Sequence, residues 1–104
     1  MNTPIKNMLT CFKNETSADT IILIRVGDYY EAFDDDAIKI SKLLTLPLLN
    51  GKTGIPYHYM EQCIPTMIRA GLRIAICDNE KIIERITPGA YYNNTLNAQN
   101  ENAA

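Results

Sequence analysis

The sequence predicts a small α+β domain in which a mixed β-sheet carries about three packed helices. Three observations predict it. The chain of 104 residues has the length of one domain. Its 46% hydrophobic and 21% charged residues are ordinary values for a soluble globular protein. Segments of helical and extended periodicity alternate along the chain, as they do in domains that pack helices on a sheet.

The first predicted helix starts at Thr3 and Pro4. Thr3 is a suitable N-cap, and proline is favoured at the first helical position. Apolar residues then recur at helical spacing and form one stripe, namely Ile5, Met8, Leu9 and Phe12. The polar stretch 13–19 is expected to end this helix.

A buried strand and a return strand follow. Residues 21–24 form a continuous apolar run, which is typical of a strand buried on both faces. Gly27-Asp28 suits a tight turn, and residues 29–33 can return as a short extended segment. Because side chains alternate across a strand, Tyr29 and Glu31 are expected to share one face.

The second predicted helix opens on three aspartates, residues 34–36, whose carboxylates complement the positive end of the helix dipole. Its buried stripe is expected to contain Phe33, Ala37, Ile40 and Leu44. Residues 46–50 are expected to form a short edge strand, since Pro47 cannot donate to a central ladder. Residues 51–54 are expected to turn, and residues 55–58 to be extended.

A third helix is predicted over residues 59–70, with Gly71 as its stop. Pro65 removes one backbone bond, so a kink or a late start is expected there. Two strands follow at 73–77 and 81–87, and Pro88-Gly89 is expected to end the ordered domain, which spans residues 1–90. The Asn-rich residues 91–104 lack periodic apolar residues and are expected to form a disordered tail. Six large side chains are expected to form one core cluster, namely Ile22, Ile24, Ile40, Met67, Ile74 and Ile76.

The sequence gives little support for a catalytic, metal or cofactor site. Cys11, Cys63 and Cys77 lack C-x-x-C spacing and, with a single His58, cannot assemble a zinc set. The cysteines are interpreted as small buried hydrophobes in a reducing cytoplasm. His58 is interpreted as a capping or core residue in preference to a catalytic one. The aspartates at 34–36 are interpreted as a helix start in preference to a magnesium site, since consecutive helical residues point in different directions. No phosphate-binding loop is present, and no apolar run is long enough to span a membrane.

Five segments carry a resemblance to a known family. In order, they read T-P at 3–4, G-D-Y-Y-E-A-F at 27–33, G-I-P-Y-H at 54–58, I-A-I-C at 74–77 and I-T-P-G at 86–89. The second resembles the G-D-F-Y-E-x-F signature of the N-terminal mismatch-recognition domain of the MutS family of DNA mismatch-repair proteins. The other segments are similar to that family's T-P, G-I-P-Y-H, V-A-I-C and V-T-P-G segments, and all five fall in the family's order.

The resemblance implies a MutS N-terminal-domain-like fold and a non-catalytic DNA-binding module for mismatched or distorted duplexes, with no cofactor. It maps Tyr29 to the aromatic wedge that stacks beside a mispaired base, and Glu31 to the carboxylate that contacts the displaced base. Under the same hypothesis, Lys52 and Arg85 contact the DNA backbone. The expected partners are distorted duplex DNA, bound weakly by the chain alone, and a repair protein that supplies the clamp and the ATPase.

Several departures from the family pattern support a second hypothesis. Tyr29 replaces phenylalanine at the wedge and is also compatible with a half-buried strand aromatic. Glu84 stands where the family often carries a phosphate-facing arginine. The formal net charge of −2 lacks the basic excess of free-standing nucleic-acid-binding domains. The alternative is therefore a stand-alone or degenerate MutS-like domain that acts as a protein-interaction module with little DNA binding of its own.

Overall fold

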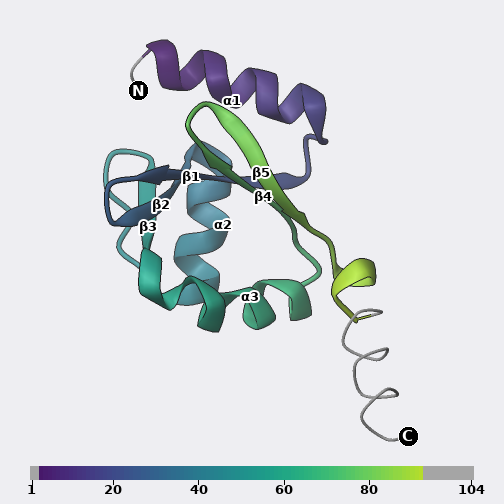
Figure 1. The fold of residues 1–104 in the computed structure, drawn as a ribbon. Helices are drawn as coiled ribbons and strands as arrows, with labels where there is room; N and C mark the ends of the chain where they lie inside the picture. The colour runs from purple at the N-terminus through teal and green to yellow at the C-terminus, as the bar shows by residue number, and fades with distance from the viewer. Residues whose placement is uncertain (1–2, 93–104) are drawn as a thin grey trace, which may run out of the picture.

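A mixed five-stranded sheet forms the centre of the computed structural model, which describes residues 3–92 (Figure 1). The strand order is β3-β2-β1-β4-β5. The elements in chain order are α1 (Thr3–Glu15), β1 (Thr20–Val26), β2 (Tyr29–Phe33), α2 (Asp34–Leu44), β3 (Lys52–Pro56), the 3₁₀ turn η1 (Tyr57–Tyr59), α3 (Met60–Arg69), β4 (Arg73–Asp78) and β5 (Lys81–Ile86). The predicted α+β class is confirmed.

The central strand β1 is buried on both faces, as its continuous apolar run predicts. It pairs in parallel with β4, where Ile22 lies opposite Ala75, and antiparallel with β2, where Ile24 lies opposite Glu31. β3 and β5 close the two edges of the sheet through antiparallel pairs. The two edge strands are therefore separated by the three inner strands.

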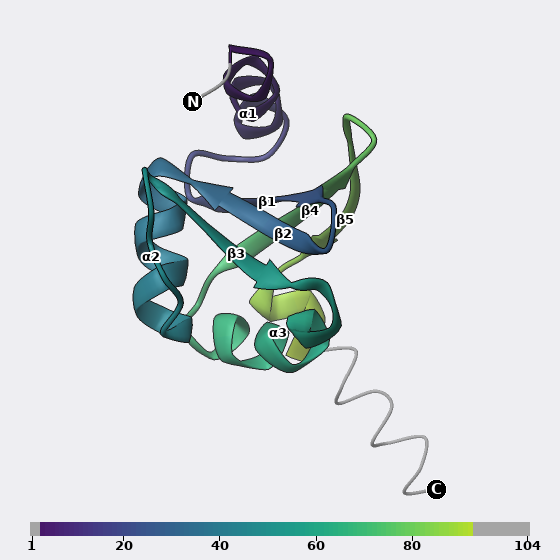
Figure 2. The ribbon, with the colours of Figure 1, turned by 90° about the vertical axis from the view of Figure 1, so that its left-hand side faces the viewer.

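The sheet divides the core into two clusters. Helix α1 covers one face, and α2 and α3 cover the other, an arrangement visible in Figure 2. On the α1 face, Ile22 and Ile24 pack with Phe12 and Phe33. On the opposite face, the cluster contains Ile40, Met67, Ile74 and Ile76 among others. All six side chains predicted for the core are buried, but the prediction of one cluster is wrong because alternate residues of a strand point to opposite faces.

The segment between α2 and β3 differs from its prediction. Residues 46–50 form no strand, and only Leu49 makes an isolated bridge, to Lys52. Asn50 and Gly51 both have positive φ and make the turn. The edge strand is instead β3, where a turn and a later extended piece were expected. The strand begins early because the backbone N–H of Asp34 donates to the Gly51 carbonyl at 2.7 Å and brings the following residues alongside β2.

The C-terminal half follows its predicted elements with two differences. Pro65 lies inside α3, and the helix begins five residues before it, so the expected late start does not occur. Gly71 has a φ of 82° and ends the helix as predicted. After β5 the chain is helical over residues 88–92, past the expected end at Pro88-Gly89. The rest of the expected tail, residues 93–104, lies outside the described residues.

A partly buried ion pair holds α1 against the sheet. Lys13 Nζ lies 2.9 Å from Asp36 Oδ2 and also donates to the backbone carbonyls of Thr20 and Ala18. The Asp36 carboxylate accepts a further hydrogen bond of 3.0 Å from the backbone N–H of Ile22. One side chain of α2 therefore fixes the end of α1 and the start of β1.

Candidate functional site

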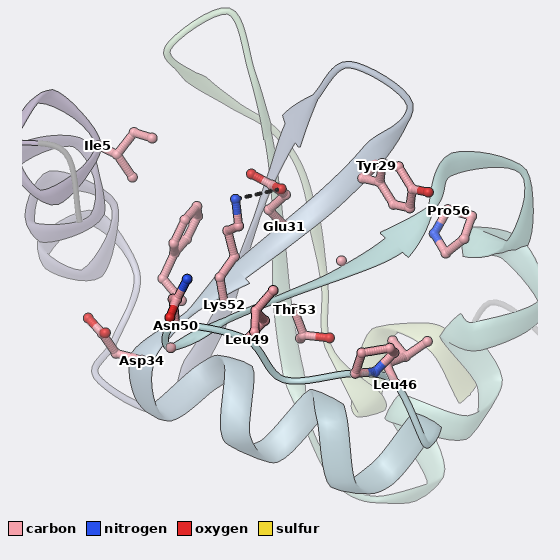
Figure 3. A pocket seen from close by; sticks show the side chains of 14 residues that line it. Ile5, Tyr29, Glu31, Asp34, Leu46, Leu49, Asn50, Lys52, Thr53 and Pro56 are labelled. Carbon is pink, nitrogen blue, oxygen red and sulfur yellow. Dashed lines mark ion pairs between the residues drawn. The ribbon is translucent and has the colours of Figure 1, made fainter.

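A hollow of about 780 Å³ lies beside the edge of the sheet formed by β2 and β3. Its walls come from the first turns of α1, the α1-facing side of β2 and β3, and the connection between α2 and β3 (Figure 3). Tyr29, Glu31 and Lys52, three of the four predicted site residues, line it. The structure therefore brings these three residues together.

Tyr29 presents its ring at the mouth of the hollow. It lies on β2 between Val26 of β1 and Pro56 of β3, and its side chain is 48% exposed. The ring packs over Gly54, where the Cβ of any larger residue would lie 3.3 Å from Tyr29 Cδ1. The expected alternation is present, because Tyr30 packs against the cluster on the opposite face of the sheet. Phe33 lies on the same face as Tyr29 and is buried beneath α1.

Glu31 lies deeper than Tyr29 and forms an ion pair with Lys52. Their closest atoms, Oε2 and Nζ, are 3.5 Å apart, and Figure 3 shows the two side chains pointing toward one another. The pair is diagonal across the strands, since Lys52 lies opposite Phe33 and Glu31 lies opposite Gly54. The Glu31 side chain is 16% exposed and that of Lys52 is 49% exposed. The ammonium therefore lies at the rim, and the carboxylate lies inside the hollow.

Arg85 lies apart from the other three site residues. It is on β5, opposite Ala75 of β4, at the far edge of the sheet. Four inter-strand spacings of about 4.8 Å separate β5 from β3, a distance of about 19 Å. Its neighbour Glu84 pairs with Ile76 and faces the other side of the sheet. A ligand bound at the hollow reaches Arg85 only if it also crosses the α1 face.

Arg25, the other arginine near the hairpin, is on the opposite face from Tyr29. It pairs with Tyr30, and its guanidinium carbon lies 4.3 Å from the centroid of the Tyr57 ring. Its Nε donates to the Gly27 carbonyl at 2.6 Å. Arg25 thus contacts an aromatic ring and the backbone of a turn, and it lies away from the hollow.

Sequence reasoning missed several residues of the hollow. Gly54 provides the bare stretch of β3 beneath Tyr29, Leu49 is 70% exposed on the connecting loop, and Ile5 reaches the hollow from α1. The missed signal for Gly54 was the alternation of β3, in which Thr53 and Ile55 are buried while Lys52, Gly54 and Pro56 face the hollow. Interpreted as a strand, residues 52–56 would have placed Gly54 beside Tyr29.

The other chemically suggestive residues lie outside this hollow or have structural partners. His58 is exposed within η1, with ring centroids 5.5 Å from Tyr57 and 5.6 Å from Tyr59, so it is not a core residue. Cys11 is exposed, which corrects the expectation that all three cysteines are buried. Burial raises the pKa of the Cys77 thiol to about 11, with a further contribution from the Glu15 carboxylate.

Metal sites and membrane spans are not found in the described part of the chain. Within residues 3–92, no three His, Cys, Asp or Glu side chains are placed to hold a metal ion together. None of the helices in that range is long and apolar enough to cross a bilayer.

Comparisons with known proteins all match the chain to one family. The family described as MutS domain I matches residues 3–95. The DNA mismatch repair protein MutS of Salinibacter ruber is 34% identical over 111 residues, covering 85% of this chain and 12% of the relative. The proteins of the same name from Cytophaga hutchinsonii and Thermotoga neapolitana are 37% and 38% identical, covering 70% and 73% of this chain. The chain thus spans about an eighth of the length of these relatives, and it belongs to the MutS domain I family.

Proposed function

We propose that this chain is a non-catalytic DNA-binding module that recognises mismatched or distorted duplexes in DNA mismatch repair. The observation that carries the proposal is the placement of a half-exposed aromatic ring, Tyr29, two residues from a carboxylate, Glu31, on one strand face at one hollow. The relatives that share this domain are named DNA mismatch repair proteins.

Stacking explains why a distorted site is favoured over a paired one. A flat ring that enters a base step replaces the stacking partner lost when the duplex kinks. Such stacking contributes about 1–3 kcal/mol per base. A mismatched or unpaired base is already weakly stacked and paired, so it costs less to displace than a paired base. Stacking on Tyr29 therefore gives the largest net stabilisation at a mismatched or unpaired base, where the free-energy cost of displacing the base is lowest.

The two proposed contacts to the DNA backbone are not equally well supported by the structure. Lys52 lies at the rim of the hollow with a half-exposed side chain, so its ammonium can turn toward a phosphate beside the base that Glu31 contacts. Arg85 is exposed on β5, at the other edge of the same sheet face. Because α1 covers the sheet between the hollow and β5, a contact from Arg85 requires a duplex that passes over α1. The partner expected to supply the clamp and the ATPase would hold the DNA from the other side.

A second candidate function is a protein-interaction module with little DNA binding of its own. The observation that favours it is that the basic residues near the hollow already contact other side chains of the protein. Lys52 is paired with Glu31, and Arg25 stacks on Tyr57 on the opposite face. Lys52 is the one basic residue among the described residues that line the hollow, so this site offers few free cations to phosphates.

Fluorescence titration at low ionic strength against a duplex with one central mismatch, and against its matched counterpart, tests the proposal. The wild-type chain is expected to prefer the mismatched duplex. Tyr29→Ala should lower affinity for that duplex by about 5- to 100-fold, the loss of one stacked base. Tyr59→Ala is the matched control, since Tyr59 is 51% exposed on η1, outside the hollow. Equal binding of both duplexes, or equal losses in the two variants, would contradict the proposal and favour the interaction module.

A further inference from the structure

The Glu31 carboxylate is the group in the hollow that can select among bases. Its side chain is only 16% exposed, so a ligand must enter the hollow to reach it. Its one ionic contact within the described residues is with Lys52, at 3.5 Å through Oε2. An ionised carboxylate accepts hydrogen bonds through both oxygens and donates none. The ligand edge that fits must therefore present donors.

The nucleobases differ sharply in what they offer to a carboxylate. An unpaired guanine presents two neighbouring donors, N1–H and the N2 amino group, which match the two oxygens of one carboxylate. Unpaired adenine and cytosine place a ring-nitrogen acceptor beside their amino group, and a carboxylate repels that acceptor. Unpaired thymine presents one donor, N3–H, between two carbonyl acceptors, so it gives the carboxylate one hydrogen bond where guanine gives two. In the minor groove of a duplex, the guanine N2 amino group is the one donor, since adenine and thymine show only acceptors there. In both settings the carboxylate fits guanine.

Lys52 completes the match. In guanine, the acceptor O6 follows N1–H along the same edge, and in the hollow a cationic donor lies next to the carboxylate. An ammonium has three donors, so it can hold Glu31 and O6 together. It also reduces the repulsion between Glu31 and the phosphates of an entering strand.

The rest of the hollow suits a flat, bulky ligand. Tyr29 and Glu31 are two residues apart on one strand face, about 7 Å along the strand. A base stacked on the Tyr29 ring therefore turns its edge toward the carboxylate. The volume of about 780 Å³ lies within the range of small-ligand sites. Gly54 has no side chain, which leaves room for the Tyr29 ring to lie directly against β3.

We propose that the hollow selects a mispaired or unpaired guanine, with Glu31 accepting from N1–H and the N2 amino group, Lys52 donating to O6, and Tyr29 stacking on the base. The inference rests on the proposed function, because it names the base that the DNA-binding site prefers. Glu31 is the specificity-determining residue, and Lys52 assists it.

Duplexes that share one sequence and carry a single extra central nucleotide test the base preference. The extra nucleotide is guanine, inosine or adenine, and the fourth duplex is fully paired. The 104-residue chain is expected to bind the guanine duplex about tenfold or more tighter than the adenine duplex, the discrimination of a good two-point contact. Inosine, which keeps N1–H and O6 but lacks the amino group, should fall between them.

Substitution of Glu31 separates base selection from general binding. Glu31→Gln puts an amide, which both donates and accepts, in place of the carboxylate and should reduce the guanine-to-adenine ratio to about twofold or less. Glu84→Gln makes the same change of charge on an exposed residue of β5 and should leave the ratio unchanged. The ratio is insensitive to a general change of affinity, which both variants share through the lost negative charge.

The possible failures are distinguishable. If the chain binds the three extra-nucleotide duplexes equally but more tightly than the paired duplex, the guanine preference is overturned and the proposed function stands. If it binds none of them more tightly than the paired duplex, both are overturned. A guanine preference that survives unchanged in Glu31→Gln overturns the assignment of the selective group to Glu31.

Discussion

The direction of the Tyr29 ring depends on a residue that has no side chain. Gly54 lies opposite Glu31 on β3, diagonal to Tyr29, and the ring occupies the space into which a side chain at this position would extend. The backbone of Gly54 is not in the left-handed region, so an alanine there meets no backbone strain. Its methyl group would instead lie 3.3 Å from Tyr29 Cδ1 and 3.4 Å from Tyr29 Cβ, tighter than ordinary contact.

Gly54→Ala is therefore expected to tilt the ring and weaken binding to a distorted duplex by about 2- to 10-fold, the cost of holding a side chain away from its preferred rotamer. In the Tyr29→Ala background, the same substitution should have no further effect, since the ring it displaces is gone. Titration of the four variants measures this coupling. Gly89→Ala, at a position with open space around it, is the control. Additive losses would show that Gly54 acts independently of Tyr29.

The three thiols are expected to react at different rates in the folded protein. Cys11 is exposed, whereas burial raises the pKa of Cys63 and raises that of Cys77 to about 11. Because the thiolate is the reactive form, a disulfide reagent at about pH 8 should modify Cys11 first and Cys77 only on unfolding. Cys11→Ser should remove the fast phase. Modification of Cys77 at the rate of Cys11 in the folded chain would contradict its buried position.

At the scale of the elements, a side chain replaces a missing strand. β2 leaves the sheet at Phe33 and turns directly into α2, so the first half of β1 has no partner on that side. Asp36, in the first turn of α2, accepts the backbone hydrogen bond of Ile22 and pairs with Lys13. The acidic start of this helix thus has a tertiary role beyond its interaction with the helix dipole.

Asp36→Ala is expected to lower the free energy of unfolding by about 2–3 kcal/mol, since it leaves the buried N–H of Ile22 without its acceptor and the ammonium of Lys13 without its counter-ion. Lys13→Met should cost less, because Lys13 is 28% exposed and removing it leaves the hydrogen bond of Ile22 intact. Urea unfolding of both variants measures the difference. Asp35→Ala, at an exposed position in the same turn, is the control. A loss for Asp36→Ala no larger than the control's would contradict this role.

The elements show what local sequence can and cannot specify. Helical stripes and the apolar run of β1 predict their elements because one face or both faces must be buried. β3 has no such pattern, since Lys52, Gly54 and Pro56 alternate with just two buried residues. This segment is a strand because the preceding turn places it beside β2.

The same limit applies to the site. A two-residue period predicts that Tyr29 and Glu31 share a face. The pairing of Glu31 with Lys52 depends on the cross-strand register of β2 and β3, which tertiary structure sets. The separation of Arg85 from the hollow likewise follows from the strand order, which no local pattern contains.

At the scale of the whole molecule, the positive charges are dispersed or paired. Lys13 is engaged by Asp36 and Lys52 by Glu31. Arg25 lies on the opposite face of the sheet, and Arg85 lies at its far edge. Acidic residues 34–36 open α2 beside the hollow, where Asp34 is one of the lining residues. Lys52 is the one basic side chain among the described residues that line the hollow, so the hollow beside Tyr29 lacks a concentrated basic rim.

This distribution predicts weak DNA binding by the isolated chain with a shallow dependence on salt. Two or three phosphate contacts give a slope of log K against log salt of about −2 to −3. Non-specific binding by proteins with adequate basic patches lies at about 10⁻⁴–10⁻⁶ M, and this chain should fall at the weak end or beyond. Kinking a duplex costs a few kcal/mol, which one stacked ring at about 1–3 kcal/mol barely offsets.

Tight mismatch binding should therefore require a partner that holds the DNA from the other side. Titration of the purified chain against mismatched and matched duplexes, at several salt concentrations from about 50 to about 200 mM, measures both affinity and slope. Lys52→Met should make the slope shallower by about one phosphate, whereas Arg25→Met, on the opposite face, should leave it unchanged. Sub-micromolar, mismatch-selective binding by the chain alone at physiological salt would refute this prediction. It would require phosphate contacts beyond those that Lys52 and Arg85 can make from opposite edges of the sheet.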